Sequence, residues 1–271
     1  MSVITEHLEL LDGQPLFWRS AGPLGDAPPL YVHGVPTSSD DFVAFLEAGG
    51  GLAVDLPGFG RSGKRADGDF TIEGYDRFLE AFLDHVGVQR VSLCMHDWGG
   101  AALAFAQRRP ERIERLVIIN AVPLLPGYRW HRLARAWRTR GVGELLMGAV
   151  NRPVLRLLTR EANVAPGPLP KAMREAILRH FDQGTQRAIL RLYRTSPEDA
   201  LIAAGARLGA LRCPALVVWG DQDPYIPARF ADAYAEALGG PAEVLHLADA
   251  GHWPWLDRPD VVGRVTRFLA G

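Results

Sequence analysis

The sequence is poor in residues that would suggest a metal site or a disulfide. Its two cysteines, Cys94 and Cys213, each lie in or beside an apolar run. A pair of thiols supplies too few ligands for a metal, and burial as small hydrophobic side chains is a simpler expectation than a disulfide. The glycine-rich stretch DLPGFGRSG (55–63) lacks the Lys-Ser/Thr ending of a phosphate-binding loop. We therefore expect neither a metal ion nor a cofactor.

Long hydrophobic runs and an excess charge of one sign are also missing. No apolar run approaches the roughly 20 residues that span a bilayer, and residues 1–18 lack the basic and apolar regions of a signal peptide. The 30 basic residues nearly balance the 31 acidic ones, and lysine occurs only at Lys64 and Lys171. These features predict a cytoplasmic protein with no nucleic-acid or membrane partner.

The chain does contain regularly alternating elements. Its 271 residues, 48% of them hydrophobic, suffice for one large domain or for a core with a modest insertion. Short apolar runs alternate with amphipathic segments, which is typical of a mostly parallel sheet covered by helices. The apolar runs predict strands at Leu30–His33, Leu52–Asp55, Val91–Met95, Leu116–Asn120, Ala215–Trp219 and Glu243–Leu247. The amphipathic segments predict helices at Ile72–Val86, Ala101–Arg109, Ala228–Leu238 and Val261–Leu269.

One region, residues 121–204, interrupts this alternation because it has no convincing strand. It holds Arg-rich amphipathic stretches such as Trp130–Arg140 and Leu169–Phe181. We expect a core in two parts, 1–120 and 205–271, with 121–204 inserted as a helical cap. In open α/β sheets function collects beyond the carboxyl ends of the strands, and the insertion follows such an end, so a lid over the site is expected.

The segment Cys94–Gly100, CMHDWGG, is the first motif that carries chemistry. It follows a buried strand and opens a helix, and a sharp strand-to-helix turn lifts its central residue above the sheet. Asp97 stands at the apex, where serine hydrolases carry serine. Helix capping is the alternative role for an aspartate at this position.

Two further motifs make a catalytic role the better explanation. His252 follows the last strand in AGH (250–252), and WGDQDP (219–224) places two acids after another strand end. The order nucleophile, acid, base is that of α/β-hydrolases. Asp221 or Asp223 could be the acid that holds the His252 ring, and we favour Asp223 because it precedes Pro224.

A fourth motif, HGVP (33–36), follows the strand at Leu30–His33. Its glycine allows the backbone to turn an amide toward the site. We expect the N–H groups of Val35 and Trp98 to form an oxyanion hole, and His33 to brace the loop by hydrogen bonding.

These motifs together resemble the α/β-hydrolase subfamily of epoxide hydrolases and haloalkane dehalogenases. The resemblance covers the core well and the cap loosely. It rests on HGVPTSS (33–39), DLPGFGRSGK (55–64), HDWGG (96–100), WGDQDPYIP (219–227) and AGHWP (250–254). It implies an α/β-hydrolase fold with a mostly parallel eight-stranded sheet and a helical cap. It also implies that Asp97 forms an alkyl ester, which water activated by His252 and Asp223 hydrolyses.

The chemistry of a carboxylate nucleophile agrees with this resemblance. A carboxylate can displace a leaving group at saturated carbon, whereas its attack on an ordinary ester would give an anhydride, so an esterase or lipase is disfavoured. A non-catalytic binding protein with this fold is a further alternative. The intact triad argues against it, because a receptor has no need of a water-activating pair.

The leaving group separates the two enzyme classes. The resemblance implies that an epoxide oxygen is protonated by cap tyrosines, for which Tyr193 and Tyr128 are the candidates. A halide needs only N–H donors, which Trp98 and a cap tryptophan, Trp130 or Trp137, could supply. Many similar dehalogenases have asparagine where this chain has Val35, which cannot donate from its side chain.

The segment Leu190–Arg194, which contains Tyr193, resembles the second cap-tyrosine motif of epoxide hydrolases. This resemblance and the departure at Val35 lead us to favour an epoxide hydrolase, with a haloalkane dehalogenase as the alternative. We expect a small apolar substrate, either an epoxide or an alkyl halide, and a monomer or homodimer.

Overall fold

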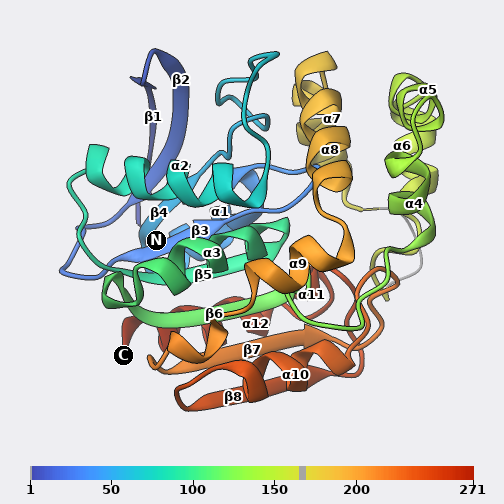
Figure 1. Ribbon diagram of the computed structural model, residues 1–271. Coiled ribbons are helices and arrows are strands. Elements are labelled where there is room, and N and C mark those ends of the chain that lie inside the picture. The colour runs from blue at the N-terminus through green and yellow to red at the C-terminus, as the bar shows by residue number, and fades with distance from the viewer. Residues whose placement is uncertain (1, 165–168) are drawn as a thin grey trace.

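The computed structural model describes residues 2–164 and 169–271. Its centre is an eight-stranded sheet in the order β1-β2-β4-β3-β5-β6-β7-β8 (Figure 1). The antiparallel pairs are β1 with β2 and β2 with β4, and the remaining neighbours are parallel. The strands are β1 (Ile4–Leu11), β2 (Gln14–Ala21), β3 (Pro29–Val32), β4 (Gly51–Val54), β5 (Val91–Asp97), β6 (Ile113–Ala121), β7 (Ala215–Gly220) and β8 (Ala242–Leu247). The six strands expected from the apolar runs are confirmed.

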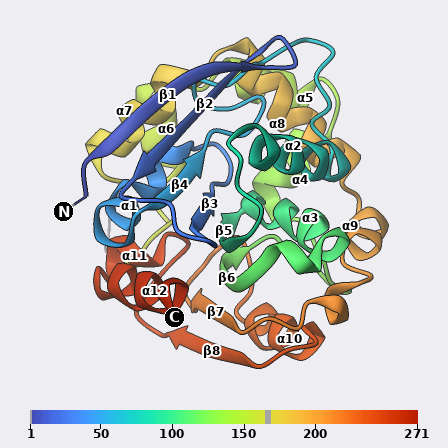
Figure 2. The same ribbon diagram turned by 90° about the vertical axis from the view of Figure 1, so that its left-hand side faces the viewer.

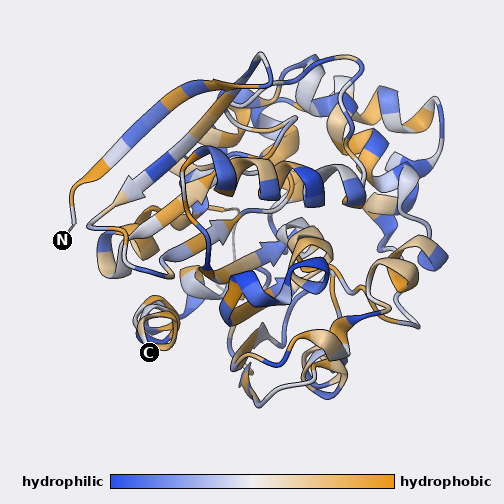
Figure 3. Ribbon diagram, turned by 60° about the vertical axis from the view of Figure 1, so that its left-hand side comes forward, coloured by the Kyte–Doolittle hydropathy of each residue, from blue (hydrophilic) through white to orange (hydrophobic). Residues whose placement is uncertain are grey.

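The hairpin of β1 and β2 is not among those six strands. Its turn consists of Asp12 and Gly13, both with positive φ, between the paired residues Leu11 and Gln14. Asp-Gly is a strong signal for a two-residue hairpin turn, so the sequence did contain this information. The alternating hydropathy of β1 is visible in Figure 3. The total of eight strands agrees with the fold that the family resemblance implied.

Helices cover both faces of the sheet. Figure 2 shows α1 (Val43–Gly49), α11 (Pro254–Asp257) and α12 (Asp260–Ala270) on one side. On the other side lie α2 (Ile72–His85), α3 (Ala102–Arg108) and α10 (Arg229–Ala237). Successive strand residues point to opposite faces, so each central strand contributes to both cores. On β6, Leu116 and Ile118 belong to the core with α2 and α3, while Val117 and Ile119 belong to the core with α12.

The described residues of the segment between β6 and β7 form helices joined by loops and contain no strand after β6 ends, with residues 165–168 lying outside them. We call its helices the inserted helices: α4 (Arg132–Arg138), α5 (Val142–Gly148), α6 (Arg152–Leu158), α7 (Lys171–His180), α8 (Gln183–Thr195) and α9 (Glu198–Ala204). Figure 1 shows α4 to α8 standing beyond the end of the sheet at which β6 finishes. They therefore lie over the carboxyl ends of the parallel strands.

The described residues also form four short 3-10 helices. They are η1 (Ser39–Phe42), η2 (Trp98–Ala101), η3 (Pro110–Arg112) and η4 (Leu208–Ala210). Among residues 2–164 and 169–271, no helix combines the length and apolar character required to cross a membrane.

Candidate active site

Asp97 lies at the sharp turn where β5 ends and η2 begins. Its backbone has φ 49° and ψ −121°, a positive-φ conformation outside the left-handed helical region that non-glycine residues rarely adopt. Two glycines make this turn possible. A Cβ on Gly99 would lie 2.1 Å from the carbonyl oxygen of Val32, and a Cβ on Gly34 would lie 2.4 Å from Cβ of Asp97. The sequence therefore presents a carboxylate, held by a strained turn, above the sheet.

The Asp97 carboxyl group is buried, and its neighbours stabilise its negative charge. Its Oδ2 accepts a hydrogen bond from the Val35 amide at 2.8 Å, and the Trp98 amide also donates to this carboxyl group. Its Oδ1 lies 3.7 Å from Nε2 of His252. Burial raises the pKa of Asp97 and the Asp223 charge adds to this effect, whereas His252 and the two amides oppose it. The two backbone N–H groups expected to form an oxyanion hole thus both point at Asp97.

His252 is joined to Asp223 rather than to Asp221. Its Nδ1–H donates to Oδ2 of Asp223 at 2.7 Å, while Asp221 pairs with His246 in a more exposed position. Asp223 is itself fixed by Asn120, whose side-chain amide donates to the same Oδ2 at 2.8 Å. The backbone N–H groups that follow, at residues 225 and 226, donate to its Oδ1 at 2.7 and 3.1 Å. Of the two candidate acids, only Asp223 orients the imidazole.

The pKa of His252 reflects opposing effects. Burial lowers it, but the charge and hydrogen bond of Asp223, followed by the charges of Asp97 and Asp41, raise it above its ordinary value overall. His96 lies on the other side, with ring centroids 4.8 Å apart, and its Nε2–H donates to the carbonyl oxygen of His252. Burial holds the pKa of His96 well below its ordinary value, so this neighbour adds no positive charge.

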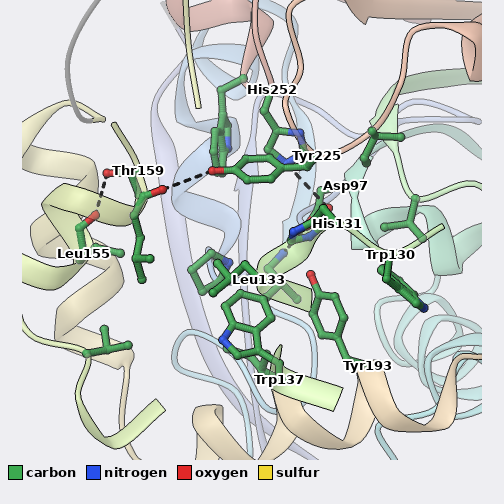
Figure 4. A pocket seen from close by; sticks show the side chains of 18 of the residues that line it. Asp97, Trp130, His131, Leu133, Trp137, Leu155, Thr159, Tyr193, Tyr225 and His252 are labelled. Atoms are coloured by element: carbon green, nitrogen blue, oxygen red, sulfur yellow. Dashed lines mark hydrogen bonds and ion pairs between the residues drawn. The ribbon is translucent and has the colours of Figure 1, made fainter. Parts of the chain in front are cut away.

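A pocket opens above the triad, and the inserted segment supplies much of its wall (Figure 4). Tyr193 on α8 and Tyr128 before α4 both line the pocket and are almost fully buried. Burial, with a contribution from Asp97, raises the pKa of each well above its ordinary value. Both hydroxyls therefore remain protonated and able to donate a hydrogen bond at neutral pH.

The three tryptophans proposed from the sequence differ in what their N–H groups can do. All three rings lie around Tyr193, at centroid distances of 5.0 to 5.2 Å. The Nε1–H of Trp130 already donates to the carbonyl oxygen of Ser196 at 3.1 Å. Trp130 therefore lines the pocket, but its N–H is not available to a ligand. The buried Nε1 of Trp98 has no hydrogen-bond partner of acceptable geometry among the described residues, and as a donor facing the Tyr193 hydroxyl it lowers the pKa of that group against the larger effect of burial.

Several residues of the site were missed in the sequence analysis. Asn120 is at the end of β6, and His131 and Tyr225 line the pocket. The Tyr225 ring packs edge-on against His252 at 5.0 Å. Asn120 could have been predicted, because function collects at the carboxyl ends of parallel strands. Nothing in the local sequence marks His131 or Tyr225 as pocket residues. His33 holds its loop as expected, since Nδ1–H donates to the carbonyl of Gly34 and Nε2 accepts from the Leu56 amide.

Residues 30–265 match the model of the alpha/beta hydrolase family. The chain belongs to the alpha/beta hydrolase family. A haloalkane dehalogenase of Mesorhizobium japonicum is 31% identical over 267 residues, which cover 87% of this chain and 81% of that protein.

Solved structures give the same fold. The crystal structure of haloalkane dehalogenase DbeA from Bradyrhizobium elkani superposes with a TM-score of 0.85 and 28% identity, covering 99% of this chain and 98% of DbeA. The epoxide hydrolase CorEH has a TM-score of 0.84 but 22% identity, with 99% of both chains covered, and so supports the fold alone. The comparisons thus do not single out the epoxide hydrolase that we favoured from the sequence, and they support the dehalogenase alternative better.

Proposed function

We propose that the protein is a haloalkane dehalogenase. Asp97 displaces halide from a saturated carbon, so that one carboxylate oxygen forms a C–O bond while the carbon–halogen bond breaks and the halide leaves with the bonding electrons. His252 then takes a proton from water, whose oxygen attacks the carboxyl carbon of the ester. Cleavage releases an alcohol and regenerates the Asp97 carboxylate.

The oxyanion of the second step forms on a carboxyl oxygen of Asp97 itself. The Val35 and Trp98 amides already donate to this carboxyl group, so they are preorganised for the charge that develops during hydrolysis. The hydrogen bond to Asp223 fixes the His252 tautomer with Nε2 free to act as the base.

The observation that carries the proposal is the unpartnered N–H of Trp98, directly after the nucleophile. A buried donor without a partner costs free energy, on the order of 1–3 kcal/mol, unless a ligand satisfies it. A halide leaving Asp97 would be such a ligand. The names of the Mesorhizobium and Bradyrhizobium proteins support the same reaction.

Epoxide hydrolysis is the second candidate, because two tyrosine hydroxyls line the pocket. An epoxide oxygen needs a proton donor as its C–O bond breaks, and Tyr193 and Tyr128 could provide one. The same triad would then release a diol.

One pair of assays separates the candidates. The protein is incubated with short bromoalkanes and, in parallel, with small epoxides, and bromide and diol are measured. Bromide release by the wild type, lost by about 10⁴-fold or more in Asp97→Asn, is the expected result. Diol without bromide would refute the proposal in favour of epoxide hydrolysis, and neither product across a broad panel would favour a binding protein.

A further inference from the structure

His131 occupies a position in the pocket that none of the roles above explains. It lies immediately before α4 and lines the same pocket as Asp97 and Tyr193. Its ring packs against Tyr225 at 5.0 Å and against Trp137 at 6.4 Å. Figure 4 shows His131 among the side chains that line this pocket. Tyr225 in turn packs on His252, so one aromatic ring positions both imidazoles.

The local structure selects one tautomer of His131. Its Nδ1 accepts a hydrogen bond from the backbone amide of Ala134 at 3.4 Å, which caps the first turn of α4. A nitrogen that accepts carries no proton, so the neutral ring has its proton on Nε2. Among the described residues, Nε2 has no hydrogen-bond partner. The hydrogen bond that caps α4 therefore leaves the Nε2–H of His131 available as a donor to the pocket.

His131 is also neutral at physiological pH. Burial, together with His252 and Arg135, lowers its pKa to about 4, against an opposing effect of Asp223. It cannot donate a full proton readily, but it can donate a hydrogen bond over the whole range in which the enzyme would work. A neutral N–H suits a halide, which departs as a stable anion and needs no proton.

The other N–H groups in the wall are less suitable. That of Trp130 donates to Ser196. The indole nitrogen of Trp137 lies on the side of its ring away from Asp97 in Figure 4. Trp98 has a free donor but stands beside the nucleophile, and a single N–H stabilises a buried anion poorly. A second N–H donor in the pocket wall would complete the site.

We propose that His131 is a catalytic residue whose Nε2–H hydrogen-bonds the departing halide, together with the N–H of Trp98. This role rests on the dehalogenase function proposed above. It replaces the donor that the Val35 side chain cannot provide and that was expected from a tryptophan of the inserted helices.

Two variants separate donation from helix capping. In His131→Asn, a side-chain oxygen can still cap α4 but no N–H reaches the position of Nε2, whereas His131→Phe loses both functions. Trp137→Phe tests separately whether the N–H of the remaining tryptophan in the wall contributes. Alkylation of Asp97 is measured in single turnovers with chloro-, bromo- and iodoalkanes of the same chain length, and halide binding is measured by the quenching of tryptophan fluorescence.

Chloride depends most on hydrogen bonding as it leaves, and iodide least. We expect both His131 variants to lose about 100-fold in alkylation with the chloroalkane and much less with the iodoalkane, and to bind bromide more weakly. An equal loss with all three halides, or full activity of His131→Asn, would overturn the role of His131 while leaving the dehalogenase function intact. A wild type that releases no halide would overturn both.

Discussion

His252 Nδ1 lies 2.7 Å from Oδ2 of Asp223, whereas its Nε2 lies 3.7 Å from Oδ1 of Asp97. The imidazole is thus hydrogen-bonded to Asp223, whereas it lies beyond hydrogen-bond distance from Asp97. This asymmetry suits a base that must leave room for a water molecule near the Asp97 ester. It also makes the charge state of His252 depend on whether Asp97 is free or alkylated.

The pH dependence of ester hydrolysis follows from this coupling. His252 acts as a base only when neutral, so hydrolysis should rise with pH through its pKa. The carboxylates of Asp223, Asp97 and Asp41 raise that pKa against burial, and alkylation removes the charge of Asp97. The pKa in the ester should therefore lie below that in the free enzyme. Single-turnover decay of the ester, measured against pH, gives this value.

The variant Asp223→Asn tests whether His252 is the group that titrates, because it removes the carboxylate that raises the pKa of His252 most. The midpoint of hydrolysis should move to lower pH while the maximum rate falls. A midpoint that does not move in this variant would show that a group other than His252 is titrating.

Gly34 should tolerate no side chain. The Cβ of an alanine would lie 2.4 Å from Cβ of Asp97, so the nucleophile or the Val35 amide must shift. Displacement of a reacting group by about 1 Å can cost about 100-fold in rate, and we expect Gly34→Ala to lose at least that much halide release. Gly148→Ala on α5, where no atom lies within 4 Å of the new Cβ, is the control. Equal activity of the two variants would contradict this account.

Asp41 should make stability depend on pH. It is buried, accepts hydrogen bonds from Thr37 and Trp253, and has a pKa raised to about 7, chiefly by burial. Because the folded state holds this proton more tightly than the unfolded chain, its contribution to stability is full below about pH 4 and declines as pH rises to about 7. The decline is at most about 4 kcal/mol.

Asp41→Asn keeps an oxygen that can accept both hydrogen bonds but does not titrate. The free energy of unfolding of this variant, relative to wild type, should therefore be higher at pH 8 than at pH 5. Urea denaturation at the two pH values tests this, and the same difference at both would mean that Asp41 keeps an ordinary pKa in the folded protein.

The sequence was most informative where function depends on a short motif at a strand end. Asp97, Asp223 and His252 each follow an apolar strand, and a parallel sheet brings such ends together whatever the rest of the chain does. The Asp12-Gly13 turn is an equally local signal. The hairpin was missed because β1 is largely exposed and β2 has an apolar run of only three residues, Leu16–Trp18.

The pocket wall could not be predicted in the same way. Whether Trp130 offers its N–H depends on the carbonyl of Ser196 beyond α8, a contact between residues 66 positions apart. The tautomer of His131 depends on its place at the start of α4, and the position of Tyr225 on its packing against two imidazoles. These are products of tertiary packing. The epoxide prediction rested on Val35 and on the candidate tyrosines Tyr193 and Tyr128, none of which reveals these contacts.

Attack of Asp97 on saturated carbon is tested most directly with the variant His252→Gln. Without the base, alkylation should proceed and hydrolysis should stop. Incubation with a bromoalkane that the wild type converts should release about one equivalent of bromide per protein and add the mass of the alkyl group to the peptide that contains Asp97. An unmodified peptide after loss of activity, or an alkyl group attached elsewhere, would contradict the account.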